Sequence, residues 1–407
     1  MRTAIVVLSA VISLVGGYLA YVATTGIPRY SPQKIALEVV RTPARVERGK
    51  KLVLLLCADC HKNPNTRELT GKYLADAPPT FGYVYSKNIT KHATKGIGAR
   101  TDGELLYFLR TGVRWDGQYV PPYMPRLTQM ADEDLFSILA FLRSDDDLVR
   151  ANAADVEEVR PTFTTKLLSH LVFSPAPYPR AAIELPSPGD RIALGRYLAV
   201  SLECFACHSK NFATNDDLVP EKSAGYFGGG NAMRQMDGST IYASNLTPDE
   251  ATGIGAWSGA DFRRALHDGF RRDGSLIRYP MNRMPELTEE EASAIYAYLQ
   301  TLPKLRYPNV PVPPPRAPSP PESRTETSSP GSRIYHRYGC QTCHGETGIA
   351  YADLRDANAR FPTNDALVSF IRDPTVTFPH TRMPRWDGVI QENEYAPLCD
   401  YVRQLAR

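Results

Sequence analysis

The chain has 407 residues, a formal net charge of +3 and 22% charged residues. Its length predicts two to four domains, since one domain usually takes about 100–200 residues. So mild a charge balance is typical of an ordinary soluble surface, and it indicates neither nucleic-acid binding nor one particular docking partner.

The first element is an apolar run from Ala4 to Ala23 that contains no charged residue. About 20 such residues are enough to cross a membrane, whereas the apolar core of a signal peptide takes about 7–15. An A-x-A cleavage site is missing, because Tyr21 stands where the first alanine would be needed before Ala23. We expect residues 1–24 to be an uncleaved transmembrane helix, with a removed signal peptide as the alternative.

A five-residue pattern, C-x-x-C-H, then occurs three times along the chain. The copies are Cys57-Ala58-Asp59-Cys60-His61, Cys204-Phe205-Ala206-Cys207-His208 and Cys340-Gln341-Thr342-Cys343-His344. This pattern is the attachment signature of c-type haem, in which both cysteines bond the haem covalently and the histidine becomes an axial iron ligand. The sequence therefore predicts three covalently bound haem c groups.

Two other sites use cysteine pairs of this spacing, a zinc site and a redox dithiol. A zinc ribbon brings its two pairs within about 15–20 residues of each other, far closer than the pairs in this chain. A redox dithiol does not require a histidine after the second cysteine in every copy. Haem attachment is the better interpretation. Haem attachment also agrees with the N-terminal apolar segment, which would place the haem domains on the periplasmic side of a bacterial inner membrane.

Residues 45–150 and 187–305 are expected to be two copies of one cytochrome c domain. Tyr85–Thr90 in the first copy matches Tyr242–Thr247 in the second at an offset of 157 residues (242 minus 85). A Gly-Ile-Gly segment follows in each copy at the same offset. Apolar residues at helical spacing then predict a closing helix in each copy. These residues are Leu135, Ile138, Leu139 and Leu142 in the first copy, and Ala292, Ile295, Tyr296 and Leu299 in the second.

Three further segments complete the chain. Residues 151–186 are a connector, whose apolar segment Leu167–Phe173 we expect to pack at a domain interface, with membrane-surface contact as the alternative. Residues 306–330 are a Pro- and Ser-rich linker that cannot bury a core. A third, smaller cytochrome c domain, 331–407, follows. We expect the first two haems to form a rigid pair and the third to reach another protein on its tether.

Each haem iron needs a second axial ligand, and Met124, Met284 and Met383 are the candidates. Each is followed by proline and lies between a C-x-x-C-H copy and a closing helix. A thioether ligand opposite histidine raises the reduction potential of haem iron. In the third domain His380 is an alternative to Met383.

The remaining sulfur and imidazole groups have no ligand pattern. Cys399 is expected to be a buried structural cysteine. Met130, Met233, Met236 and Met281 are expected to be packing or loop residues, and His92, His170, His267 and His336 to be surface or structural residues.

Together these features resemble the three-haem, membrane-attached cytochrome c subunits of periplasmic dehydrogenases of the alcohol and gluconate types. The resemblance covers residues 45–305 and is clearest at Asn245-Leu246-Thr247-Pro248 and Gly253-Ile254-Gly255-Ala256-Trp257. The first copy departs from it, with Lys91 in place of Pro248 and Arg100 in place of Trp257. The resemblance implies an all-α chain of three tandem cytochrome c domains.

The same resemblance implies an electron carrier rather than an enzyme. Its partners would be a periplasmic dehydrogenase as donor, and quinone or another respiratory carrier as acceptor. The alternative is a haem enzyme such as a di-haem peroxidase, which needs one iron with an open position. Three methionine candidates argue against that alternative.

Overall fold

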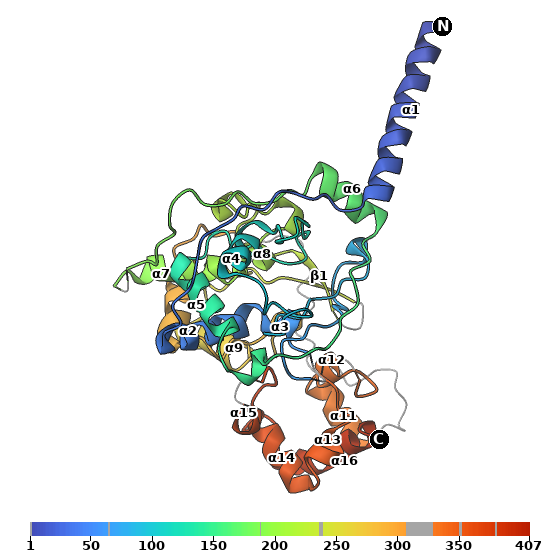
Figure 1. Cartoon of the computed structure of the whole chain (residues 1–407). Coiled ribbons are helices and arrows are strands. Elements are labelled where there is room, and N and C mark those ends of the chain that lie inside the picture. The colour runs from blue at the N-terminus through green and yellow to red at the C-terminus, as the bar shows by residue number, and fades with distance from the viewer. Residues whose placement is uncertain are drawn as a thin grey trace. The chain divides into compact units, whose positions relative to one another are not determined.

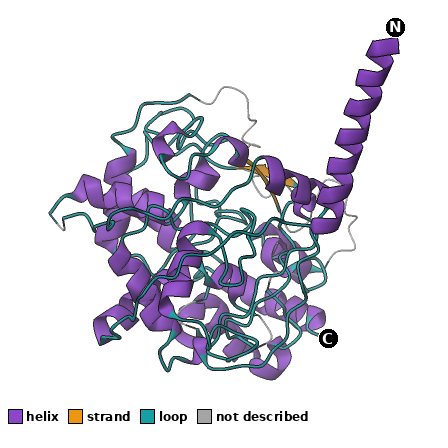
Figure 2. Cartoon of the chain, turned by 45° about the horizontal axis from the view of Figure 1, so that its top comes forward, coloured by secondary structure: helices purple, strands orange, loops and turns teal. Residues whose placement is uncertain are grey.

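The computed structural model describes residues 2–63, 66–187, 189–235, 239–306, 329–349, 352–378 and 381–407. Helices and loops make up nearly all of this part of the chain, as Figure 2 shows. Within it, β1 (Ala232–Arg234) and β2 (Thr240–Tyr242) pair antiparallel, with Met233 opposite Ile241. The expected all-α class is confirmed, with this hairpin as a small addition. Most of the predicted linker lies outside the described residues.

The chain forms two compact units, residues 1–185 and 186–407. The first unit holds the N-terminal helix, the first C-x-x-C-H segment and the connector. Its helices are α1 (Arg2–Thr25), α2 (Pro43–Leu56), α3 (Ala58–His61), η1 (Pro79–Phe81), α4 (Asp102–Thr111), α5 (Asp132–Leu142), η2 (Asp147–Val149) and α6 (Phe163–Leu171).

Helix α1 is the predicted apolar element, and Thr3–Thr25 is long and apolar enough to cross a membrane. Figure 1 shows α1 in blue, with α6 beside its C-terminal end. The segment Leu167–Phe173 therefore packs within the first unit, as part of α6 and the residues just after it.

The second unit contains the other two C-x-x-C-H segments. Its helices in residues 186–306 are α7 (Arg191–Ser201), α8 (Cys204–His208), η3 (Phe212–Thr214), η4 (Pro220–Lys222), α9 (Gly259–His267) and α10 (Glu289–Leu299). Those in residues 329–407 are α11 (Pro330–Arg337), α12 (Gln341–His344), α13 (Ala357–Arg360), α14 (Asn364–Arg372), α15 (Pro374–Thr377), η5 (Glu392–Glu394) and α16 (Tyr395–Leu405).

The helices expected to close the three domains are present as α5, α10 and α16. Their apolar stripes form the cores, and Leu135, Leu139 and Leu299 are fully buried. Thr288 and Glu291 make a capping box at the start of α10. Each closing helix packs on the helix that leads into C-x-x-C-H, in the pairs α2 with α5, α7 with α10, and α11 with α16.

All three helix pairs meet at a glycine of the leading helix. A Cβ atom on that glycine would overlap a backbone carbonyl oxygen of the closing helix. The pairs are Gly49 with Ser137 O at 1.8 Å, Gly195 with Ala294 O at 1.9 Å, and Gly331 with Pro397 O at 2.0 Å. Only glycine permits so close an approach of two helix backbones.

The third domain differs from the expectation of a free domain on a tether, because it packs against the second domain within one unit. Phe270 of the second domain belongs to the same buried apolar cluster as Trp386 and Leu398 of the third. The expected rigid pairing of the first and second haems stays a prediction.

Candidate haem sites

The cysteines and histidines of each C-x-x-C-H copy lie on a single turn of helix. In the first copy the backbone N–H of His61 donates to Cys57 O at 2.8 Å. In the third copy the N–H of His344 donates to Cys340 O at 3.0 Å. A helical turn places two thiols three residues apart on one side, with the next side chain beside them. This local geometry is the one that haem attachment requires.

The thiols have the chemistry of buried, protonated groups. Burial raises the pKa of Cys57, Cys204 and Cys340 to about 12, and that of Cys60 to about 11. Reactive dithiols need the opposite shift, since the thiolate is the nucleophile. Within the described part of the chain, no three His, Cys, Asp or Glu side chains could hold a metal ion together. Both observations favour haem attachment over a redox dithiol or a zinc site.

Each of the three motif histidines makes the same kind of hydrogen bond, and this bond is the most informative feature of the sites. In each, ring atom Nδ1 lies within hydrogen-bond distance of a backbone carbonyl oxygen. The pairs are His61 with Lys87 O at 2.7 Å, His208 with Ser244 O at 2.8 Å, and His344 with Ala352 O at 2.8 Å. A carbonyl can only accept, so Nδ1 carries the proton and Nε2 keeps a free lone pair. This is how a metal-bound histidine is usually oriented.

Burial also lowers the pKa of His61, His208 and His344, so each imidazole stays neutral near pH 7. A metal accepts the lone pair of a neutral imidazole and cannot bind an imidazolium. The cysteine pairs and the histidines together suit a haem c group in each of the three segments.

The Asn-x-Thr element of the repeat fixes the carbonyls that orient two of these histidines. Asn88 follows Lys87 directly, and its Oδ1 accepts bonds from Thr90 N at 2.9 Å and Thr90 Oγ1 at 2.8 Å. Asn245 follows Ser244 and makes the same two bonds with Thr247, at 2.9 and 2.7 Å. The repeat therefore holds the residue on which each histidine depends.

The Gly-Ile-Gly element packs on this same turn. Ile97 N donates to Thr90 O at 2.9 Å, and Ile254 N donates to Thr247 O at 3.0 Å. A Cβ atom on Gly96 would lie 2.2 Å from Thr90 O, so glycine is needed there. This contact shows that the element is structural. These segments are recognisable in the sequence as a repeat, whereas their role is not, since a backbone acceptor has no side-chain signature.

The candidate sixth ligands are half-buried and lie on loops, with the backbone N–H of each methionine hydrogen-bonded. Met124 N donates to Pro121 O at 3.3 Å, and Met284 N donates to Leu266 O at 2.6 Å. Met383 N donates to Thr381 Oγ1 at 3.1 Å. The ligand role of each methionine stays a prediction, and His380 lies outside the described residues.

Several residues without a ligand pattern also have clear positions. Cys399 is completely buried in the core of the third domain, as expected. Met130 is 1% exposed and packs in the first core. His170 Nε2 lies 3.0 Å from Gly26 O, and His336 pairs with Glu346 at 2.8 Å, so both have structural partners.

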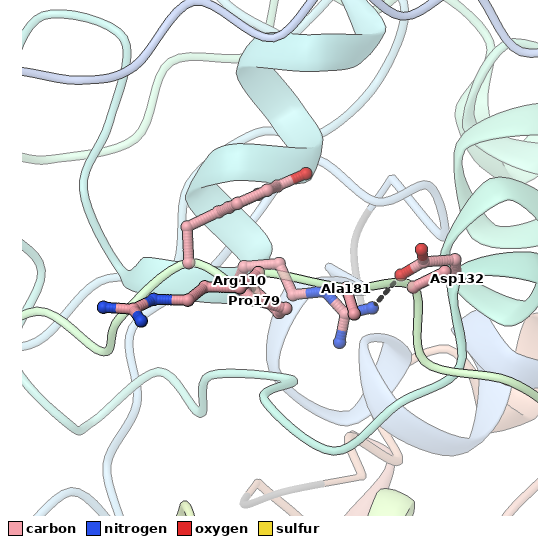
Figure 3. A pocket seen from close by; sticks show the side chains of 7 residues that line it. Arg110, Asp132, Pro179 and Ala181 are labelled. Carbon is pink, nitrogen blue, oxygen red and sulfur yellow. Dashed lines mark hydrogen bonds and ion pairs between the residues drawn. The ribbon is translucent and has the colours of Figure 1, made fainter.

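The first unit also has a small hollow under the connector, seen from close by in Figure 3. Arg110, which is 1% exposed, forms an ion pair there with Asp132, and Pro179 and Ala181 of the connector line the same hollow. The lining includes none of the predicted haem-site residues. This hollow is where the connector packs on the first domain.

Comparison with known proteins gives a family match for the C-terminal part of the chain. Residues 326–402 match the family described as cytochrome C oxidase, cbb3-type, subunit III. The match covers the third C-x-x-C-H segment and the helices around it.

Longer matches are to cytochrome subunits of dehydrogenases. The fructose dehydrogenase cytochrome subunit of Gluconobacter japonicus is 30% identical over 63% of this chain and 52% of the relative. The gluconate 2-dehydrogenase cytochrome c subunit of Pantoea cypripedii is 30% identical over 64% of this chain and 60% of the relative. The alcohol dehydrogenase (quinone) cytochrome c subunit of Gluconacetobacter polyoxogenes is 28% identical over 85% of this chain and 77% of the relative.

The chain thus spans between half and two thirds of the first two relatives, and more of the third. The chain is related to the cytochrome c subunits of dehydrogenases, as its motifs predict.

Proposed function

We propose that this chain, a relative of dehydrogenase cytochrome c subunits, is a three-haem electron-transfer subunit that serves a dehydrogenase at a membrane. One observation carries the proposal: all three motif histidines donate from Nδ1 to a backbone carbonyl and keep Nε2 for iron. Haem c supplies one-electron transfer when it is bound. The polypeptide then supplies attachment, ligands and a protected environment.

The proposed ligand set is the same in each domain. Cysteine pairs 57 and 60, 204 and 207, and 340 and 343 attach the groups, and His61, His208 and His344 bind from one side. Met124, Met284 and Met383 bind from the other side. A methionine opposite histidine favours reduced iron, and a filled sixth position excludes small ligands such as peroxide. Both properties suit an electron carrier better than a peroxidase.

The proposed partners follow from the relatives. Their names give fructose, gluconate and alcohol dehydrogenases, and one name includes the word quinone. We infer a dehydrogenase as electron donor, and quinone or another respiratory carrier as acceptor. The haem domains would lie on the periplasmic side of a bacterial inner membrane, with α1 as the anchor.

The test begins with purification of the full chain from membranes under mild detergent. Intact mass should exceed that of the polypeptide by three haem groups, and a dehydrogenase should co-purify. Adding the substrate of that dehydrogenase should reduce the haem, as read from visible absorption. Adding CO to the reduced protein should leave the spectrum unchanged. A haem that binds CO rapidly, combined with peroxide turnover, would favour the peroxidase instead.

A further inference from the structure

We propose that the second and third haem domains are locked together through their Met-Pro loops and work as a fixed pair. The lock is made by Arg283 and Glu286 of one loop and Arg382 of the other. The link to haem rests on the proposed function, because it treats Met284 and Met383 as ligands. The lock itself depends only on contacts between side chains and backbone.

The two loops exchange hydrogen bonds directly. Arg283 Nη2 donates to Thr381 O of the third domain at 2.9 Å, and its Nη1 donates to His267 O of its own domain at 3.2 Å. In return, Arg382 Nη1 donates to the backbone carbonyl of Arg283. Each arginine stands immediately before a candidate ligand methionine. A movement of one loop is therefore transmitted to the backbone of the other.

An ion pair closes the same contact. Arg382 Nη1 lies 3.3 Å from Glu286 Oε2, and the two side chains are only 14% and 6% exposed. Exposed ion pairs contribute little to stability, but removing one partner of a buried pair leaves a charge without compensation. Arg283 is itself 3% exposed. These are interior contacts rather than a chance meeting of solvated side chains.

Apolar packing continues the interface. Phe270 of the second domain meets Trp386 of the third edge to face, with ring centroids 5.9 Å apart and an interplanar angle of 88°. Both rings are 4% exposed. Leu276 of the second domain packs against the same cluster. Aromatic pairs of this geometry stabilise a contact beyond what the area that they bury contributes.

The internal repeat provides independent support, because the first domain has other residue types at the positions of Arg283, Glu286 and Phe270. At the offset of 160 (284 minus 124), the counterpart of Arg283 is Tyr123 and that of Glu286 is Arg126. At the offset of 157 (242 minus 85), the counterpart of Phe270 is Val113. An arginine in place of Glu286 would repel Arg382. The two copies share their haem motifs but differ at the residues that bind the third domain. We infer that the second copy has become specialised for this contact.

Hydrogen–deuterium exchange on the full, haem-loaded chain tests the lock. Glu286→Gln removes one charge and keeps the shape of the side chain, whereas Arg382→Gln removes the charge together with the guanidinium that makes both contacts. Loss of a hydrogen bond to a charged group costs about 1.5–3 kcal/mol, which corresponds to roughly tenfold or greater loss of protection. We expect Glu286→Gln to raise exchange at residues 381–390, and Arg382→Gln to raise it at residues 266–287, both across the interface.

The matched control is Arg385→Gln, in the same loop. Arg385 pairs with Asp373 of its own domain at 3.0 Å and is 54% exposed, so the second domain should keep its protection. The loss of protection in the double variant should be only slightly larger than that in the more affected single variant, because both substitutions remove the same ion pair. The lock is wrong if neither variant changes exchange in the opposite domain, or if the two effects simply add.

A second readout separates the lock from the haem assignment. Potentiometric titration of Arg382→Gln should shift two midpoint potentials, those of the second and third haems, while Arg385→Gln shifts at most one. Faster exchange in the opposite domain, combined with an unchanged midpoint potential of the second haem, would support the lock and overturn its connection to the ligand loops.

Discussion

At the scale of single residues, backbone carbonyls control the chemistry of the sites. Lys87, Ser244 and Ala352 contribute no side chain to the histidines, yet each holds an imidazole by its carbonyl oxygen. Such a bond fixes the tautomer and raises the basicity of the ligand nitrogen. Substitutions of Lys87 or Ser244 that keep the backbone in place should therefore be tolerated, in contrast to substitutions of the histidines.

Met284 provides the sharpest residue-scale prediction. Met284→Ala should keep the haem attached, because Cys204, Cys207 and His208 remain, but it should open the sixth position of that iron. The reduced variant is then expected to bind CO, seen as a change in the Soret absorption, and the potential of that haem should fall.

The control for this experiment is Met281→Leu, three residues earlier in the same loop and expected only to pack. It should bind no more CO than the unmodified chain. Equal CO binding by the two variants, or none by Met284→Ala, would show that Met284 is not the ligand.

At the scale of elements, the three helix crossings depend on glycine. Gly195→Ala would place a Cβ atom 1.9 Å from Ala294 O and 2.9 Å from Tyr298 Cβ, so α7 and α10 would have to move apart. Overpacking of this kind costs about 1–3 kcal/mol. We expect thermal unfolding, followed by circular dichroism, to shift several degrees lower.

Gly259→Ala is the matched control within the same domain. Its added Cβ atom would come no closer than 3.6 Å to any neighbour, and alanine is the better helix former. Its melting temperature should stay the same or rise. Equal losses of stability in the two variants would show that the close approach at Gly195 is not what stabilises the crossing of α7 and α10.

Elements with a periodic signal were predictable from sequence, whereas contacts between elements were not. The apolar spacing of Leu135, Ile138 and Leu139 predicts α5, and C-x-x-C-H carries its own chemistry. Arg283 and Arg382, in contrast, look like ordinary loop charges, and nothing in a Pro-rich linker shows where the next domain packs. The useful signal was the difference between the two repeats, in which Tyr123 occupies the position equivalent to Arg283.

At the scale of the whole molecule, the first domain is closely tied to the N-terminal helix. The segment after α1 runs along this domain, with Tyr30 N bonded to Gly117 O at 2.8 Å and Val39 N bonded to Asp102 Oδ2 at 2.9 Å. The connector returns over the same domain, where Asp132 N donates to Ile183 O at 2.9 Å. With α1 in a membrane, the first haem would stay near its surface.

Contacts at the end of α1 lead to a prediction about whether this helix is cleaved from the mature protein. Val22 is fully buried, and Lys166 Nζ of α6 donates to Ala23 O at 3.2 Å. Residues earlier in α1 are exposed apolar side chains, such as Ile5 at 57% and Leu14 at 75%. We expect a helix with an exposed apolar body and a packed end to act as an anchor joined to its domain. Cleavage after Ala23 would remove residues on which α6 packs.

We therefore expect the mature protein to retain α1. Intact-mass measurement should give the full polypeptide plus its haem groups, and alkaline washing should leave the chain in the membrane. A chain in which residues 1–25 are replaced by a cleavable export signal should be released by the same wash with its haem attached. A native mature chain that begins near residue 24 would overturn the anchor, because α6 would then have to be stable without the end of α1 beside it.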